Sequence, residues 1–401
     1  MGMKNKHLIF LTLLITIVLL ISGCTTEQND ESNADNNNDN GASDEDNSNV
    51  NDSDENNNAS SFTAFDYPPF NLEKVYYILP MGGMSGGHVT PIDHQYYVSY
   101  DFDLGSNAAV DIEVYSPANG TVTSIQHMNI AAGDNPIPVD DFRLTIQHTP
   151  TISSYYIHID EISEKLMAVD PGLGNYSSVN VEVSAGEVIG HYGGSVDYNI
   201  VDEDVELAFI NPSSYETEPW KIHCPDPFDY FNDSIKNQMI EKCLRTDDPT
   251  GGKICYDIDG RLVGTWFENG TNGYEGVDPE RYWAGHLSIV YDSIDPDAII
   301  ISIGTFIDSA QQFAVKDNSP DPVDITVDDG LVIYELTDYE HYKNDTMWDR
   351  NSFVQGLKVR NGESTRGVIL LQLLEDRKLK VEIFPDETAD SFTENAKIYV
   401  R

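Results

Sequence analysis

Positively charged residues are scarce in this chain of 401 residues. There are 23 Lys and Arg against 68 Asp and Glu, so the formal net charge is −45 at pH 7. An acidic surface of this size repels the phosphates of nucleic acids and the headgroups of anionic lipids. We therefore set nucleic-acid binding aside. The composition suits solubility in salt, cation binding, or contact with a basic or neutral polymer.

Long apolar runs are missing too, except near the N-terminus. Lys4 and Lys6 precede the stretch LIFLTLLITIVLL, which has signal-peptide length and is short for a membrane span. The following ISGC is similar to a lipobox, where signal removal leaves a lipid-bearing cysteine. We predict a lipoprotein signal over residues 1–24, with lipid on Cys24 anchoring the exported chain to the outer face of the cell membrane. A plain signal peptide or an N-terminal anchor helix is the alternative.

The next stretch, residues 25–61, contains no basic and no aromatic residue. It cannot bury enough apolar surface to offset the entropy lost on ordering. We therefore predict a disordered, acidic, Asn-rich linker over residues 25–64, which holds the folded part away from the membrane.

From about Phe65 the chain changes to short runs rich in Val, Ile, Tyr and Thr, separated by Gly, Pro, Asn and Asp. One helix is predicted in PFDYFNDSIKNQMIEKCL, where apolar residues recur at helical spacing. The stretch GTWF is similar to a lipocalin strand. We predict a mainly β protein with a β domain over residues 65–220, a helical connector over 221–255, and a C-terminal β-barrel or β-sandwich over 256–401.

Cysteine is rare, and three of the four cysteines flank the predicted helix. In an exported chain we expect two of these three to pair. Three zinc thiolates are the alternative, although no fourth ligand lies at zinc-site spacing. The disulfide candidates are Cys224, Cys243 and Cys255. Nucleophile elbows, phosphate loops and dinucleotide-binding motifs are absent from the sequence.

Four stretches of the first β region resemble, in order, parts of the lysostaphin-type (LytM-like, duplicated hybrid motif) zinc endopeptidases. They are VYSPANGTVTSI, FRLTIQHTPTISSYYIHIDEIS, VEVSAGEVIGHYGG and VELAFINP. The resemblance covers residues 80–212 and implies an antiparallel LytM-like β domain. The stretches GHVTPIDHQY, CPDPFDYF and FTENAKIYV are similar to degenerate, exported relatives of these peptidases, which keep the fold without the full metal set.

The resemblance also implies where a zinc site would lie. Family members hold zinc with two His and one Asp, and two further His assist the reaction. His158 matches the family's Tyr-x-His position. In VELAFINP, Glu206 falls at the first His of the H-x-H motif, and Ala208, which offers no lone pair, falls at the second.

The H-x-x-x-D motif is disturbed as well. His88 and Asp93 are one residue too far apart, and His94 would need an Asp where Val98 stands. A rebuilt zinc site could still use carboxylates as ligands. Otherwise these groups line a polar groove and hydrogen-bond one another. The metal-ligand candidates are His88, Asp93 and His94; the catalytic candidates, if the domain is active, are His158 and Glu206; the groove candidates are His148, His191 and Tyr97.

Because the H-x-H motif is missing, we expect no hydrolysis and no cofactor. The sequence predicts an exported, membrane-anchored lipoprotein whose peptidase-like domain binds a cell-envelope polymer or another envelope protein. The alternative is an active zinc-dependent endopeptidase of cell-wall peptides, with zinc in a rebuilt site. A purely structural surface module is a third hypothesis.

Overall fold

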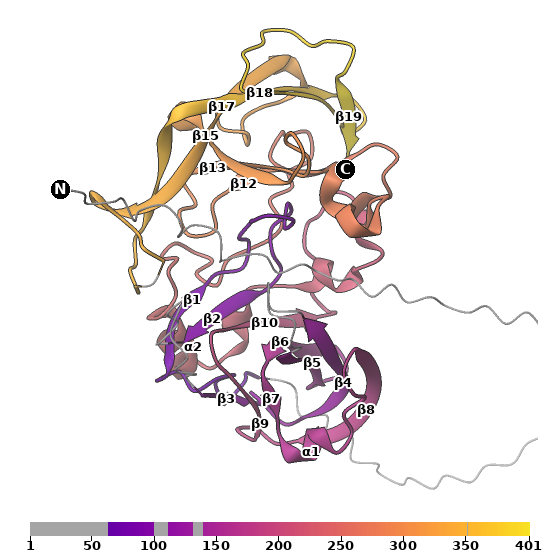
Figure 1. The fold of residues 1–401 in the computed structure, drawn as a ribbon, viewed down its shortest axis with the longest axis vertical. Coiled ribbons are helices and arrows are strands. Elements are labelled where there is room, and N and C mark those ends of the chain that lie inside the picture. The colour runs from indigo at the N-terminus through magenta and orange to yellow at the C-terminus, as the bar shows by residue number, and fades with distance from the viewer. Residues whose placement is uncertain (1–62, 100–110, 131–138, 351) are drawn as a thin grey trace, which may run out of the picture. The chain divides into compact units, whose positions relative to one another are not determined.

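The computed structural model describes residues 63–99, 111–130, 139–350 and 352–401 (Figure 1). Residues 64–401 belong to one compact unit. The predicted signal segment 1–24 with Cys24, and residues 25–62 of the predicted linker, lie outside the described residues. Within the described part, no helix is both long and apolar enough to cross a membrane. Lipidation and the linker therefore stay predictions.

Residues 75–202 form an antiparallel sheet of seven strands and a smaller sheet of three, drawn in indigo to magenta in Figure 1. The larger sheet has the order β1 (Val75–Leu79), β2 (Gln95–Ser99), β10 (Ser195–Asp202), β6 (Ile152–Ile159), β5 (Val139–Gln147), β4 (Gly120–Ile130) and β8 (Asn175–Val183). The smaller sheet has the order β3 (Ile112–Tyr115), β9 (Val188–Tyr192) and β7 (Glu161–Ile162), and the short helix α1 (Glu164–Met167) follows β7.

One face of the larger sheet packs an aromatic core around Phe70. Its ring centroid lies 4.5 Å from that of Tyr97 and 5.7 Å from those of Tyr156 and Tyr198. All four side chains are fully buried. We expected Tyr97 to line a binding groove, but it lies in this core. Successive strand residues face opposite ways, so Tyr96 takes the other face of the sheet.

The helix that the sequence predicts after the first β region is shorter than its apolar pattern. Helix α2 spans Asp233–Ile240 and follows the 3-10 turn η3 (Pro227–Tyr230). The side chain of Asn232 accepts hydrogen bonds from the backbone N–H groups of Ser234 and Ile235. This cap fixes the start of α2. Two further 3-10 turns, η1 (Pro212–Tyr215) and η2 (Pro219–His223), come earlier in the chain.

Cys224, Cys243 and Cys255 are free thiols, so the structure does not contain the disulfide that we expected. The thiol of Cys224 donates to the carbonyl oxygen of Trp220, and that of Cys243 donates to the carbonyl oxygen of Thr250, each at 3.2 Å. Burial raises the pKa of both Cys243 and Cys255 to about 12. These thiols are therefore protonated at neutral pH.

The C-terminal region is a closed antiparallel barrel, in orange to yellow in Figure 1. Its ring runs β14 (Gln311–Val315), β13 (Ile299–Ile303), β12 (His286–Tyr291), β11 (Gly264–Glu268), β19 (Lys397–Val400), β18 (Lys378–Pro385), β17 (Lys358–Leu374) and β15 (Leu331–Lys343). Pairing between β14 and β15 closes the ring, and β16 (Thr346–Met347) pairs with β15 outside it. The mainly β prediction is confirmed, and the barrel is the architecture adopted.

Buried aliphatic and aromatic side chains form the barrel core, with Trp266 of the GTWF stretch among them. The guanidinium carbon of Arg401 lies 4.0 Å from the Trp266 ring centroid. Arg401 also donates to the backbone carbonyls of Ile258 and Val263. Short 3-10 turns connect the strands: η4 (Gly273–Glu275), η5 (Pro279–Gly285), η6 (Lys316–Asn318) and η7 (Val327–Asp329).

Candidate functional site

The second face of the seven-stranded sheet carries polar side chains. Arg143 on β5 pairs with Ile157 on β6, and Ile157 pairs with Asp197 on β10. Asp197 in turn pairs with Tyr96 on β2. Directly paired residues point to the same face of a sheet, so this row lies opposite the aromatic core. We call this surface the polar face.

Asp93, just before β2, is the centre of a buried hydrogen-bonded cluster at the polar face. Its Oδ1 lies 3.2 Å from Nζ of Lys221 and 3.1 Å from Nδ1 of His94. Its Oδ2 accepts a hydrogen bond of 3.0 Å from the indole N–H of Trp220. The side-chain amide of Asn199 donates to the backbone carbonyl of Asp93. Both carboxylate oxygens of Asp93 are thus occupied by groups of the protein itself.

The Asp93–Lys221 pair is ionised although it is buried. Asp93 is 4% and Lys221 7% exposed. Burial alone would raise the pKa of Asp93, but Lys221 and His94 outweigh it and hold that pKa well below its usual range. Burial alone would lower the pKa of Lys221, but Asp93 and its neighbours raise it well above its usual range.

The turn η2 brings Trp220 and Lys221 to the polar face. It starts with Pro219, whose fixed φ suits the first helical position. The carbonyl of Ile222 accepts a hydrogen bond of 2.8 Å from the N–H of Leu207. Lys221 also lies 3.1 Å from Oε2 of Glu218. These contacts hold the ammonium group in place.

His158 has a strained backbone, with φ of 74°. The β5–β6 register shifts next to it, between Phe142 and Arg143. Non-glycine residues at positive φ are uncommon and cost free energy, and they concentrate at functional sites. The bulge turns the His158 ring to Asp141, whose Oδ2 lies 2.8 Å from its Nδ1.

Asp197 joins the two histidines of the polar face. Its Oδ2 lies 3.2 Å from Nε2 of His94 and 3.7 Å from Nε2 of His158. Burial alone would lower the pKa of His158, but the carboxylates of Asp197 and Asp141 outweigh it and raise the pKa to about 9. His158 is therefore a cation at neutral pH, and it offsets part of the negative charge.

Three buried acceptors at this face have no hydrogen-bond partner among the described residues. They are Oδ1 of Asp141, Oδ1 of Asp197 and Oδ1 of Asn199. Buried polar atoms are nearly always satisfied, so such exceptions mark strained or functional positions. The polar face therefore keeps hydrogen-bonding capacity that the described chain does not use.

The side chains of the polar face do not fit a catalytic zinc site. Such a site needs three converging donors and an open fourth position. Asp93 is already bonded through both oxygens, and the ammonium of Lys221 beside it would repel a metal ion. Among the described residues, no group of three or more His, Cys, Asp or Glu has the arrangement to hold a metal.

The structure brings some of the predicted site residues together. Asp93, His94 and His158 meet through Asp197. His88 is close enough for the charges of His94 and Lys221 to act on it, and burial followed by these charges lowers its pKa to about 4.

Three other predicted residues lie elsewhere. Glu206 is exposed in an irregular segment, because β10 ends at Asp202 and the stretch VELAF forms no strand. The ring of His148 hydrogen-bonds Ser154 Oγ at 2.8 Å. His191 lies on β9, in the smaller sheet.

Sequence reasoning missed Asp141, Asp197, Asn199 and Lys221. Asp197 and Asn199 stand two residues apart in SVDYNIVD, so strand alternation places both on one face. The two-residue spacing of these side chains was therefore a signal in the sequence that both belong to the site. Lys221 comes from a 3-10 turn far along the chain, and its contact with Asp93 has no local sequence pattern.

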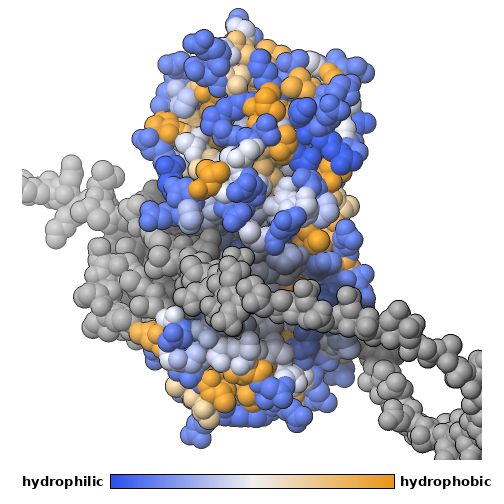
Figure 2. Space-filling model, turned by 90° about the vertical axis from the view of Figure 1, so that its right-hand side faces the viewer, coloured by the Kyte–Doolittle hydropathy of each residue, from blue (hydrophilic) through white to orange (hydrophobic). Residues whose placement is uncertain are grey.

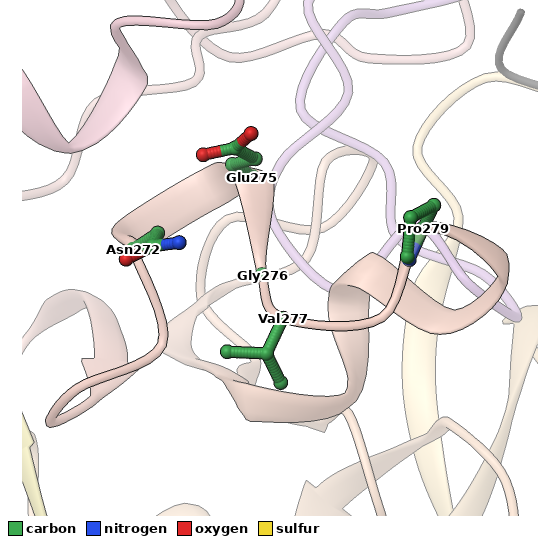
Figure 3. Close-up of a pocket in the computed structure, with 5 residues that line it drawn as sticks. All are labelled: Asn272, Glu275, Gly276, Val277 and Pro279. Atoms are coloured by element: carbon green, nitrogen blue, oxygen red, sulfur yellow. The ribbon is translucent and has the colours of Figure 1, made fainter. Parts of the chain in front are cut away.

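Two cavities are lined by other residues. One of about 230 Å³ lies at Asn272, Glu275, Gly276, Val277 and Pro279, around η4 (Figure 3). One of about 520 Å³ lies between η1, η4 and β11 and includes Ser213, Thr217 and Glu268 in its lining. Figure 2 shows one face of the molecule on which hydrophilic residues predominate, with smaller hydrophobic groups among them.

Comparisons with known proteins find a distant likeness among solved structures. No family model matches the chain, and no curated protein matches it. Among solved structures, the chain is similar to a zinc-containing peptidase from Vibrio cholerae, at 16% sequence identity and a TM-score of 0.20. The match covers 35% of this chain and 38% of that chain, so it spans well under half of the peptidase's length.

Proposed function

We propose that this chain is an exported, membrane-anchored lipoprotein whose first β domain is a non-hydrolytic binding module. Its ligand is a cell-envelope polymer or an envelope protein, and it is bound at the polar face. The lipid anchor on Cys24 and the linker of residues 25–64 rest on sequence pattern alone. They would hold the module at the outer face of the membrane.

The observation that carries the proposal is the buried Asp93–Lys221 pair. In a zinc peptidase, the metal supplies the positive charge that balances its carboxylate ligand and activates water. Here the Lys221 ammonium balances Asp93 instead, at 3.2 Å. An ammonium has no open coordination position and cannot lower the pKa of a bound water in the same way. The side chains of this face are therefore suited to recognition through charge and hydrogen bonds.

The test uses the full chain purified in detergent. After dialysis against trace zinc, metal content is measured by mass spectrometry, and binding is measured by co-sedimentation with the insoluble envelope polymer of the producing cells. We expect no stoichiometric zinc and equal co-sedimentation with and without a chelator. One zinc per chain that is lost in His94→Ala, together with cleavage of cell-wall peptides, would instead support the alternative of a rebuilt zinc endopeptidase.

A further inference from the structure

The guanidinium of Arg143 lies near two aromatic rings at the polar face. Its guanidinium carbon is 5.5 Å from the ring centroid of Tyr155 on β6 and 5.6 Å from that of Trp220 on η2. Tyr155 is buried, while Arg143 and Trp220 are partly buried. Trp220 is itself held by its hydrogen bond to Asp93. Burial thus restricts the Tyr155 ring and the hydrogen bond restricts the Trp220 ring, and the guanidinium contacts both.

Arg143 has no hydrogen bond or ion pair with any described residue, which sets it apart in this chain. Each of the other arginines, from Arg245 to Arg401, donates at least one hydrogen bond to a protein oxygen. Asp and Glu outnumber Lys and Arg by 68 to 23. Because the guanidinium of Arg143 has no acidic partner in so acidic a chain, we expect it to bind a group from outside the described residues.

The ring contacts leave the donors of Arg143 without an oxygen partner among the described residues. Aromatic rings attract a guanidinium through its positive charge, and this attraction does not replace hydrogen bonds from its N–H groups. These donors form a planar fork that matches the two oxygens of a carboxylate. Because the side chain is already ordered, binding would cost little additional rotamer entropy.

The net charge of the chain decides between a carboxylate and a phosphate. Repulsion from the acidic surface grows with the charge on the ligand, and a phosphate carries more charge than a carboxylate at neutral pH. Exposed charges are screened beyond roughly 8 Å at physiological salt, so the local charges matter most for a short contact. Lys221 is paired with Asp93 and Glu218, and His158 with Asp141 and Asp197, so neither cation is left to offset a second negative charge. A monoanionic group is therefore the better fit.

We propose that Arg143, beside the rings of Tyr155 and Trp220, is the ligand-binding residue of the polar face that takes a carboxylate group. This inference rests on the proposed binding function and adds the chemistry of its ligand. The ligand would present a free carboxylate, such as that of a peptide C-terminus, on an otherwise neutral envelope polymer.

The experiment compares small probes on the full chain in detergent. The probes are N-acetylalanine, its C-terminal amide, and inorganic phosphate. Binding is followed by ¹⁹F NMR of 5-fluorotryptophan, with the Trp220 signal assigned from Trp220→Phe. We expect N-acetylalanine to move the Trp220 signal in a saturable way, the amide to leave it unchanged, and phosphate to bind more weakly. Equal shifts with acid and amide on the unmutated chain, or tighter binding of phosphate, would overturn the carboxylate assignment.

Variants then test the role of Arg143. Arg143→Gln should weaken N-acetylalanine binding by about tenfold or more, because it removes a charge-assisted hydrogen-bond donor. Arg143→Lys should keep part of the binding, since the charge remains and the fork is lost. The matched control is Arg360→Gln. The guanidinium carbon of Arg360 also lies over a ring, 4.7 Å from the centroid of Tyr342, but Arg360 is paired with Asp345. Unchanged binding in Arg143→Gln would refute the inference.

Polymer co-sedimentation separates this inference from the proposed function. If Arg143→Gln still sediments with the envelope polymer as the unmutated chain does, the binding function stands and the carboxylate contact fails. If the unmutated chain does not bind the polymer but does bind N-acetylalanine through Arg143, the site stands and its assigned partner fails.

Discussion

The ammonium of Lys221 lies 3.2 Å from Oδ1 of Asp93, and both side chains are buried. The two residues are far apart in sequence, and their contact joins the turn η2 to the residues that precede β2. Removing one partner of a buried ion pair leaves an uncompensated charge, and this costs more than the pair contributes as a whole.

Lys221→Met should therefore destabilise the fold by about 3–5 kcal/mol, measured by urea unfolding. The double variant Asp93→Asn with Lys221→Met should lose less stability, because it leaves no buried charge without a partner. The control is Lys236→Met, since Lys236 pairs with Asp229, whose side chain is 64% exposed. Such a surface pair contributes at most about 1 kcal/mol. If both lysine variants lose the same small amount, the buried pair is not ionised.

His158 should make stability depend on pH between 6.5 and 9. Its pKa is raised to about 9 by Asp197 and Asp141, against the opposing effect of burial. The folded state therefore binds a proton that the unfolded state releases above about 6.5. The stabilisation is complete below pH 6.5 and is lost as pH rises through 9, up to about 3 kcal/mol.

Urea unfolding at several pH values measures this dependence. Asp292 also raises the pKa of His341, against burial, so the unmutated chain carries both contributions. His158→Gln should remove the His158 part of the slope and leave the His341 part. A slope that is identical in His158→Gln and in the unmutated chain would contradict the ion pairs assigned to His158.

His148 should make the stability depend on pH in the opposite direction to His158, and at acidic pH. Burial lowers its pKa to about 4, against a small opposing effect of the Asn119 carbonyl. Below pH 6.5 the unfolded chain takes up a proton that the folded His148 does not. Stability should therefore fall as pH drops from 6.5 to 4. His148→Gln should flatten this part of the profile, while His191→Gln on β9, outside the larger sheet, is the control.

The sequence predicts much of the fold and less of the site. The strands of the first β region and those of the barrel lie in short runs rich in Val, Ile, Tyr and Thr, and such runs can be recognised from the local sequence. The resemblance placed Glu206 of VELAFINP in the site, whereas β10, which carries Asp197 and Asn199, lies earlier in the chain in SVDYNIVD. The contacts of Lys221 and Trp220 depend on how η2 folds back onto the sheet. Such long-range packing produces no periodic pattern in the sequence.

Chelation should not change stability if the polar face is metal-free. A ligand that binds only the folded state raises the unfolding midpoint as its concentration rises above its Kd. We expect the thermal midpoint of the full chain to be the same in chelator and in added zinc. The control is Asp93→Asn, which removes a candidate ligand: if zinc raises the midpoint of the unmutated chain and not of this variant, a metal site exists at Asp93.

Arg401 should be a main stabilising residue of the barrel. Its guanidinium lies 4.0 Å from the Trp266 ring and donates to the carbonyls of Ile258 and Val263. Arg401→Met would leave these acceptors unpaired, and the buried carbonyl of Val263 would cost about 1–3 kcal/mol. The control is Arg377→Met, because the Arg377–Asp259 pair is at least half exposed on both sides and should contribute little to stability. Urea unfolding followed by tryptophan fluorescence reports both, and equal losses in the two variants would show that Arg401 does not stabilise the barrel through these buried contacts.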